Sequence, residues 1–68
     1  MNKDANRGFT LGIIYSAATL MMICQETAAE QLIYEAGISW ADLRKVGADP
    51  QDREQLRRIK HVFEGERP

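Results

Sequence analysis

The chain has few of the features that usually stabilise or equip a short protein. Its 68 residues include one cysteine, one histidine and two prolines, and its net charge is −1. One cysteine cannot form an internal disulfide, and Cys24 with His61 supplies too few ligands for a structural zinc site. The near-neutral balance excludes a strongly basic nucleic-acid binder of the histone type, and the 44% hydrophobic content excludes a disordered acidic tail. We therefore expect no metal and no cofactor.

A monomer of this size is expected to be only marginally stable. A chain of about 60 residues buries only about 60% of its unfolded surface when it folds alone. No linker, repeat or low-complexity segment divides the sequence, so we predict one domain over residues 1–68, with residues 1–7 and 64–68 as frayed ends. Self-association is the remaining way to bury more apolar surface.

Residues 9–24 form the most apolar segment and predict a buried helix. Only Thr10, Gly12, Ser16 and Thr19 interrupt the run. At 100° per residue the last three fall in a narrow stripe, so apolar side chains occupy most of the helix circumference. Because one small domain cannot cover such a helix on every side, we predict a homodimer. The predicted interface consists of apolar residues of this helix: Phe9, Leu11, Ile13, Ile14, Leu20, Met21 and Met22.

The same run is too short to span a membrane. As a helix it measures about 24 Å, whereas the hydrocarbon core of a bilayer is about 30 Å thick. The bulky residues 21–24 also stand where a signal peptide or an acylated cysteine needs small ones. The sequence favours a helix inside a folded domain, and no membrane partner is expected.

Start and stop signals predict two further helices in the middle of the chain. Residues 27–30 (TAAE) form a capping box, with Thr27 as the first cap, and predict a helix to about Ala36 that Gly37 ends. Residues 39–42 (SWAD) form a weaker box and open a short helix that Gly47 ends.

A last helix is predicted from Pro50 to about Phe63. Asp49 is an acidic cap, and proline at the first helical position loses no hydrogen bond. Apolar residues on one face of this helix recur at i, i+3, i+6 and i+7, namely Leu56, Ile59, Val62 and Phe63. No alternating pattern indicates a strand. The predicted fold is all-α, a small bundle of about four helices.

Neither His61 nor Cys24 indicates catalysis. A general base needs a positioned partner and a substrate pocket, and no second residue pairs with His61 by spacing. Cys24 ends an apolar run, where a buried and inert thiol is the common outcome. We predict that the protein is not an enzyme.

Five residues are candidates for contact with a partner. Arg53, Arg57 and Lys60 stand at i, i+4 and i+7, so they share one stripe of the last helix. Such stripes are usually solvated surface; if this one is functional, it suits an acidic protein surface at least as well as a nucleic acid. Trp40 either closes the small core or anchors an interface, and Arg44 follows it on the short helix.

A DNA-binding interpretation remains as the alternative. Two short helices joined at Gly37, with Leu43 six residues later, resemble a helix-turn-helix. Against it, Ile33 is large where such helices cross closely, and Asp42 would face a polyanion. The second helix offers only Arg44 and Lys45 as phosphate contacts.

Two stretches resemble a phage protein family. They are residues 6–12 (NRGFTLG) with 15–19 (YSAAT), and residues 35–44 (EAGISWADLR). They look similar to short accessory proteins of lambdoid bacteriophages, encoded in the early region between the exonuclease and excisionase genes. The resemblance covers most of the chain and includes no catalytic signature. It implies a small, all-helical, self-associating early protein in the host bacterial cytoplasm that acts on host or phage regulators. A single unpaired cysteine agrees with a reducing compartment.

The leading hypothesis is therefore a non-enzymatic protein-interaction module that modulates a host or phage protein by binding it. Its predicted partner-binding residues are Trp40, Arg44, Arg53, Arg57 and Lys60. A small DNA-binding regulator built on the Gly37 turn is the competing hypothesis.

Overall fold

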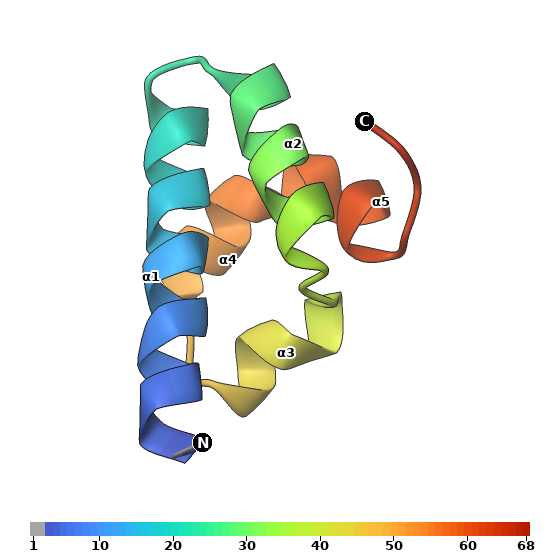
Figure 1. The fold of residues 1–68 in the computed structure, drawn as a ribbon. Coiled ribbons are helices and arrows are strands. Elements are labelled where there is room, and N and C mark those ends of the chain that lie inside the picture. Colours follow the sequence, from blue (N-terminus) through green and yellow to red (C-terminus); the bar gives the residue numbers. More distant parts are fainter. Residues whose placement is uncertain (1–2) are drawn as a thin grey trace.

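The computed structural model describes residues 3–68, and this part of the chain is all-α, as predicted (Figure 1). The first three helices are α1 (Lys3–Met22), α2 (Glu26–Ala36) and α3 (Trp40–Lys45). One bent segment follows, made of α4 (Pro50–Leu56), a 3-10 turn η1 (Arg57–Ile59) and α5 (Lys60–Phe63). If that segment is counted once, the described chain has four helical segments.

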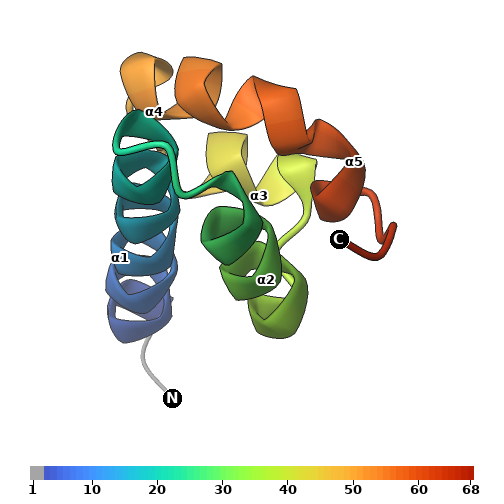
Figure 2. The same ribbon diagram turned by 90° about the horizontal axis from the view of Figure 1, so that it is seen from above.

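The helices form two layers. α1 and α2 run antiparallel as a hairpin, and the α4–η1–α5 segment crosses behind them (Figures 1 and 2). α3 lies across the end of the molecule that holds the start of α1, and its short connections lead from α2 and into α4 (Figure 1). Along this path α4 packs against α1.

One side of α1 forms the centre of the core. Ile14, Ala17, Ala18 and Met21 are buried there at i, i+3, i+4 and i+7, the spacing of one helix face. Two of the four are alanines, and α2 adds the fully buried Ala29, so the two backbones can approach closely. The other elements complete the core with Ile33, Ile38, Leu43, Ala48, Leu56, Ile59, Val62 and Phe63.

This packing corrects part of the predicted dimer interface. Ile14 and Met21 are 1% and 5% exposed, so the chain's own core buries them and a second copy cannot contact them. Leu11, Ile13 and Leu20 are half-buried against the same core. Among the predicted residues, only Phe9 and Met22 are largely exposed. The sequence could not separate these sets because the run is apolar on most sides.

The predicted boundaries of α3 and the start of α4 are confirmed. Ser39 Oγ accepts a hydrogen bond from the Asp42 backbone N–H at 3.3 Å, and the Asp42 carboxylate accepts from the Ser39 N–H at 2.9 Å. Together these two bonds make the capping box. The Asp49 carboxylate likewise accepts from the Gln51 N–H at 2.8 Å and caps α4. Gly47 follows α3 in the left-handed conformation, with φ 74°.

The predicted start of α2 is wrong. The helix begins at Glu26, with Gln25 as its cap residue and no side-chain capping bond, so Thr27 lies inside the first turn. The cause is the turn that ends α1. Cys24 adopts φ 63°, its N–H donates to the Met21 carbonyl, and the Gln25 N–H donates to the Leu20 carbonyl at 2.7 Å. This pair of bonds is a Schellman motif, and it leads the chain straight into α2 at Glu26, one residue before Thr27. At the other end, Gly37 terminates α2 with φ 67°, as predicted.

The last predicted helix is interrupted rather than continuous. Residues 57–59 form a 3-10 turn between α4 and α5. Leu56, Ile59 and Val62 are three residues apart and nearly fully buried. A helix with three residues per turn places this spacing on one line, whereas an α-helix would rotate every third residue away from the core. Tertiary burial of these three residues accounts for the local tightening.

The first helix extends beyond the apolar run toward the N-terminus. α1 begins at Lys3, so residues 3–7 are helical, while residues 1–2 lie outside the described range. Arg7 fixes this first part of α1, because its Nε donates to the Val46 carbonyl at 3.0 Å. Residues 64–68 follow the last helix and are exposed.

Candidate functional site

A groove between α3 and α4 brings together most of the predicted partner-binding residues. Its volume is about 370 Å³, and it is lined by Trp40, Ala41, Arg44, Lys45 and Arg53. Four of these come from one face of α3 at i, i+1, i+4 and i+5, and Arg53 reaches the groove from α4. We call this feature the α3/α4 groove. It combines an aromatic wall with three cationic side chains.

Trp40 links the α3/α4 groove to the core. The half-buried indole packs edge-on against Phe63, with ring centroids 5.2 Å apart and planes at 82°. The Lys60 ammonium lies over the same indole, 5.3 Å from its centroid, a cation–π contact. Trp40 therefore packs against the core and also presents surface to the groove, while its role as an interface anchor stays a prediction. Lys60 borders the groove through Trp40.

The cations that line the groove have no carboxylate partner among the described side chains. The ion pairs in this part of the structure lie elsewhere: Arg57 with Glu54 at 3.4 Å, Lys60 with Glu64 at 4.0 Å, and His61 with Glu30 at 3.4 Å. Arg57 is thus paired and does not line the groove. The Nε atom of Arg53 is buried and has no hydrogen-bond acceptor in the structure.

The Asp42 carboxylate of α3 already accepts a hydrogen bond from the residue that caps its own helix, Ser39. The pKa of Asp42 is lowered, mainly because its carboxylate accepts the Ser39 backbone N–H, and the nearby Lys45 ammonium acts in the same direction. A second notch lies on the other side of α4. It is lined by Met22, Gln51, Asp52, Glu54 and Gln55. Burial and the neighbouring Asp49 carboxylate raise the pKa of Asp52 there. α4 therefore has a cationic flank at the groove and an acidic flank at the notch.

Lys45 lines the groove, although the predicted set of partner-binding residues does not include it. That set takes its cations from the stripe of the last helix. In the structure, Arg53 lines the groove, Arg57 pairs with Glu54, and Lys60 lies over Trp40. The signal that points to Lys45 is on α3 itself, because Ala41 and Lys45 are four residues apart and lie beside the pair Trp40 and Arg44. The position of Arg53 of α4 opposite that face follows from the tertiary fold.

The segment proposed as a helix-turn-helix has the expected turn and a very short second helix. Gly37 ends α2, Ile38 is buried, and Ser39 caps α3. Leu43 is fully buried, as predicted from its spacing. However, α3 contains only six residues, and the Asp42 carboxylate occupies its first turn.

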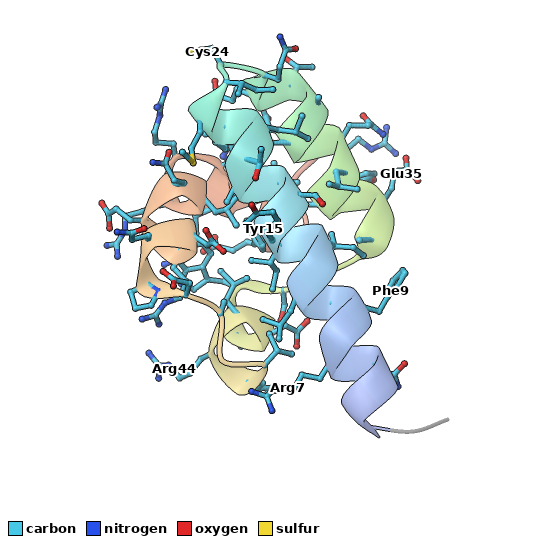
Figure 3. All side chains as sticks on the ribbon, turned by 90° about the vertical axis from the view of Figure 1, so that its left-hand side faces the viewer. Arg7, Phe9, Tyr15, Cys24, Glu35 and Arg44 are labelled. Atoms are coloured by element: carbon cyan, nitrogen blue, oxygen red, sulfur yellow. The ribbon has the colours of Figure 1, made fainter. Side chains whose placement is uncertain are left out.

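The outer face of α1 is the second exposed feature. Phe9, Tyr15, Met22 and Ile23 are between 59% and 72% exposed. Figure 3 shows Phe9 and Tyr15 projecting on opposite sides of α1, and Cys24 at the far end of the helix. Between these large residues lie the exposed Gly12, Ser16 and Thr19.

The two aliphatic hydroxyl groups on this face are already paired. Ser16 Oγ donates to the Gly12 carbonyl at 2.8 Å, and Thr19 Oγ1 donates to the Tyr15 carbonyl at 2.9 Å. No charged residue occurs from Gly8 to Cys24. Another surface can therefore cover the Ser16 and Thr19 side chains of the outer face of α1 without leaving their hydroxyl groups unpaired.

Over the described residues, no cluster of three or more histidine, cysteine or carboxylate side chains is placed to hold a metal ion. Cys24 is exposed rather than buried. No helix in the same range is both long enough and apolar enough to cross a membrane. Comparison with protein-family models, curated proteins and solved structures gave no match to this chain.

Proposed function

We propose that this protein is a non-enzymatic interaction module that binds an acidic surface of a partner protein through the α3/α4 groove. The observation that carries the proposal is the set of three cations, Arg44, Lys45 and Arg53, gathered around Trp40 without carboxylate partners among the described side chains. The resemblance to early phage accessory proteins supports a host or phage regulator in the bacterial cytoplasm as the partner.

The energetics of the groove favour an anionic partner. The chain as a whole is nearly neutral, so the positive charge at the groove is local. Like charges held together repel each other, and an acidic surface removes that repulsion while gaining charge-assisted hydrogen bonds. Tryptophan and arginine are also the residues that contribute most often to binding hot spots.

We also propose that two copies associate through the outer face of α1. A helical strip from Phe9 to Ile23 is about 22 Å long and about 10 Å wide, so pairing two such strips covers roughly 440 Å² in total. This area lies well below that of standard stable interfaces. The homodimer is therefore expected to be weak, with a dissociation constant of roughly 100 μM.

DNA binding is the competing function, and the α2–Gly37–α3 turn is the observation in its favour. The charge distribution on α3 favours a protein partner instead. A recognition helix presents its N-terminal residues to the bases. Here that turn holds the Asp42 carboxylate, while Arg44 and Lys45 lie in the last turn.

The test of partner binding compares two charge reversals of equal size. Arg44→Glu with Arg53→Glu changes the groove, whereas Arg58→Glu with Arg67→Glu changes two exposed cations elsewhere by the same net charge. We expect the immobilised wild type and the control variant to retain the same protein from a bacterial lysate, and the groove variant to lose it. Equal retention by both variants contradicts the proposal.

A duplex-binding assay separates the DNA hypothesis. Fluorescence anisotropy of a labelled 20-base-pair duplex is measured at low and at physiological salt. We expect no saturable binding by the wild type at either salt concentration. Binding that falls steeply with salt and is lost in the groove variant would assign the groove to phosphate contacts instead.

The test of self-association uses sedimentation velocity across a wide concentration range. We expect the weight-average sedimentation coefficient of the wild type to rise over about 5 to 500 μM. Phe9→Glu with Met22→Glu places charges on the outer face of α1 and should keep the protein monomeric, whereas Arg58→Glu should not. A wild type that stays monomeric throughout rules out this dimer.

A further inference from the structure

We propose that the α3/α4 groove recognises one acidic side chain of a partner helix together with an apolar side chain one turn away. This inference rests on the proposed function and names the chemistry of its ligand. The groove volume of about 370 Å³ lies within the range of pockets that enclose a ligand. It therefore has room for more than a single carboxylate.

The spacing of groove residues along α3 determines the spacing required of the ligand. Trp40 and Ala41 form an apolar end, and Arg44 and Lys45 form a cationic end four residues later. Four residues of α-helix rise about 6 Å. A partner helix that lies along the groove meets both ends when it carries its apolar and acidic residues at positions i and i+4.

Arg53 provides the specific donor. Its Nε is buried without an acceptor, and no described carboxylate pairs with its guanidinium. A buried N–H group without a partner is unfavourable, so a rotation of the guanidinium that exposes Nε to an incoming acceptor is stabilising. When the guanidinium turns toward the groove, Nε and a terminal nitrogen form a fork that matches the two oxygens of a carboxylate. Lys45 and Arg44 add positive charge on the opposite wall.

The position of the groove favours a carboxylate over a phosphate. Phosphate sites commonly use backbone N–H groups at a helix N-terminus. The cationic end of this groove lies at the last turn of α3, where the backbone N–H groups are used within the helix and are not free to bind an anion. The groove therefore offers side-chain donors only, and these suit the two oxygens of a carboxylate.

Titration with designed peptides tests the proposal. The probe is a capped, alanine-rich peptide of about 15 residues that carries Leu and Glu four residues apart. Two comparison peptides replace the Glu with Gln or with phosphoserine. Trp40 is the only tryptophan of the chain, so its fluorescence reports directly on the groove. Amide chemical shifts of the labelled full chain then locate the binding surface.

We expect the Glu peptide to saturate the Trp40 signal, with shifts confined to α3 and α4. Arg53→Gln should weaken binding about tenfold, the effect of losing a charge-assisted pair. Lys45→Gln should weaken it by a smaller factor. The matched control Arg58→Gln changes an exposed arginine outside the groove and should leave the affinity within about twofold. Far-UV circular dichroism verifies that each variant is folded. If Arg53→Gln does not fold, Arg53→Lys replaces it in the binding comparison.

Several results would overturn this inference. They are equal binding of the Gln peptide, tenfold tighter binding of the phosphoserine peptide, an equal loss in Arg58→Gln, or no binding of any peptide at about 5 mM. None of them decides the proposed function, because retention of a whole protein partner by the charge-reversal variants is measured separately. Loss of that selective retention, in turn, removes the proposed function.

Discussion

The turn after α1 allows a substitution with a defined free-energy change. Cys24 is the only described residue other than glycine with a positive φ, and its side chain is exposed. A side chain in the left-handed region costs about 1–2 kcal/mol, because Cβ approaches the following carbonyl oxygen. Glycine avoids this cost but loses about 0.5–1 kcal/mol more chain entropy on folding. We predict that Cys24→Gly stabilises the fold by about 0.5–1 kcal/mol.

This change is large enough to measure in so small a protein. A domain of this length is stable by roughly 3–10 kcal/mol in total. Each kcal/mol shifts Tm by about 4–8 °C, so Cys24→Gly should raise Tm by roughly 2–8 °C. Urea unfolding in reducing buffer, followed by Trp40 fluorescence and far-UV circular dichroism, gives the free energy. A protein concentration of about 2 μM keeps self-association out of the measurement.

Two control substitutions separate the backbone from the thiol. Cys24→Ser keeps the same backbone cost and removes the sulfur, so its stability should match that of the wild type. Cys24→Val adds a β-branched side chain in a left-handed conformation and should destabilise the fold. If Cys24→Gly is no more stable than Cys24→Ser, the argument from the positive φ is wrong.

Three further substitutions test the placement of α3. Asp42→Asn weakens the capping box and should cost about 1 kcal/mol at pH 7. Because the Ser39 N–H lowers the pKa of Asp42, this contribution is present above the unfolded pKa, near 3.8, and is lost as pH falls through the folded pKa. Urea titrations of the wild type and Asp42→Asn should therefore converge in strong acid; a constant difference excludes the carboxylate as the cause. Leu43→Ala empties a fully buried site and should cost about 2–5 kcal/mol, a large part of the total stability, with Tm as the readout. Gly47→Ala requires a positive φ and places Cβ 3.3 Å from Arg7 Nη2, so it should lower Tm by several degrees; an unchanged Tm contradicts this.

Local signals in the sequence determined the limits of the short helices. Ser39 and Asp49 accept hydrogen bonds from N–H groups that the helix itself leaves unpaired, and those groups lie within three residues of the cap. Gly37 and Gly47 end their helices through their own backbone conformation. Because each of these interactions is local, it can be predicted without knowing the rest of the fold. Local reasoning of the same kind predicted the wrong start for α2. The turn at Cys24 sets that boundary, so Thr27 lies inside the helix and does not cap it.

The candidate site was predictable only in its composition. Trp40, Arg44 and Arg53 were selected as exposed anchors and cations, and all three line the groove. Their proximity depends on how α4 packs against α1, because Arg53 reaches the groove from a different helix than Trp40 and Arg44. Arg57 was selected by an α-helical repeat that the 3-10 turn interrupts, and it pairs with Glu54.

The sequence by itself determined that this chain is all-helical, where its short helices begin and end, and that α1 is apolar on most sides. Only the tertiary structure decided which apolar residues of α1 are buried, because the stripe of Gly12, Ser16 and Thr19 marks one exposed side but does not show how far the buried face extends around the helix. That choice placed Ile14 and Met21 in the core and left Phe9 and Met22 exposed. It also decided the 3-10 turn, since the burial of Leu56, Ile59 and Val62 outweighs the better hydrogen-bond geometry of a continuous α-helix.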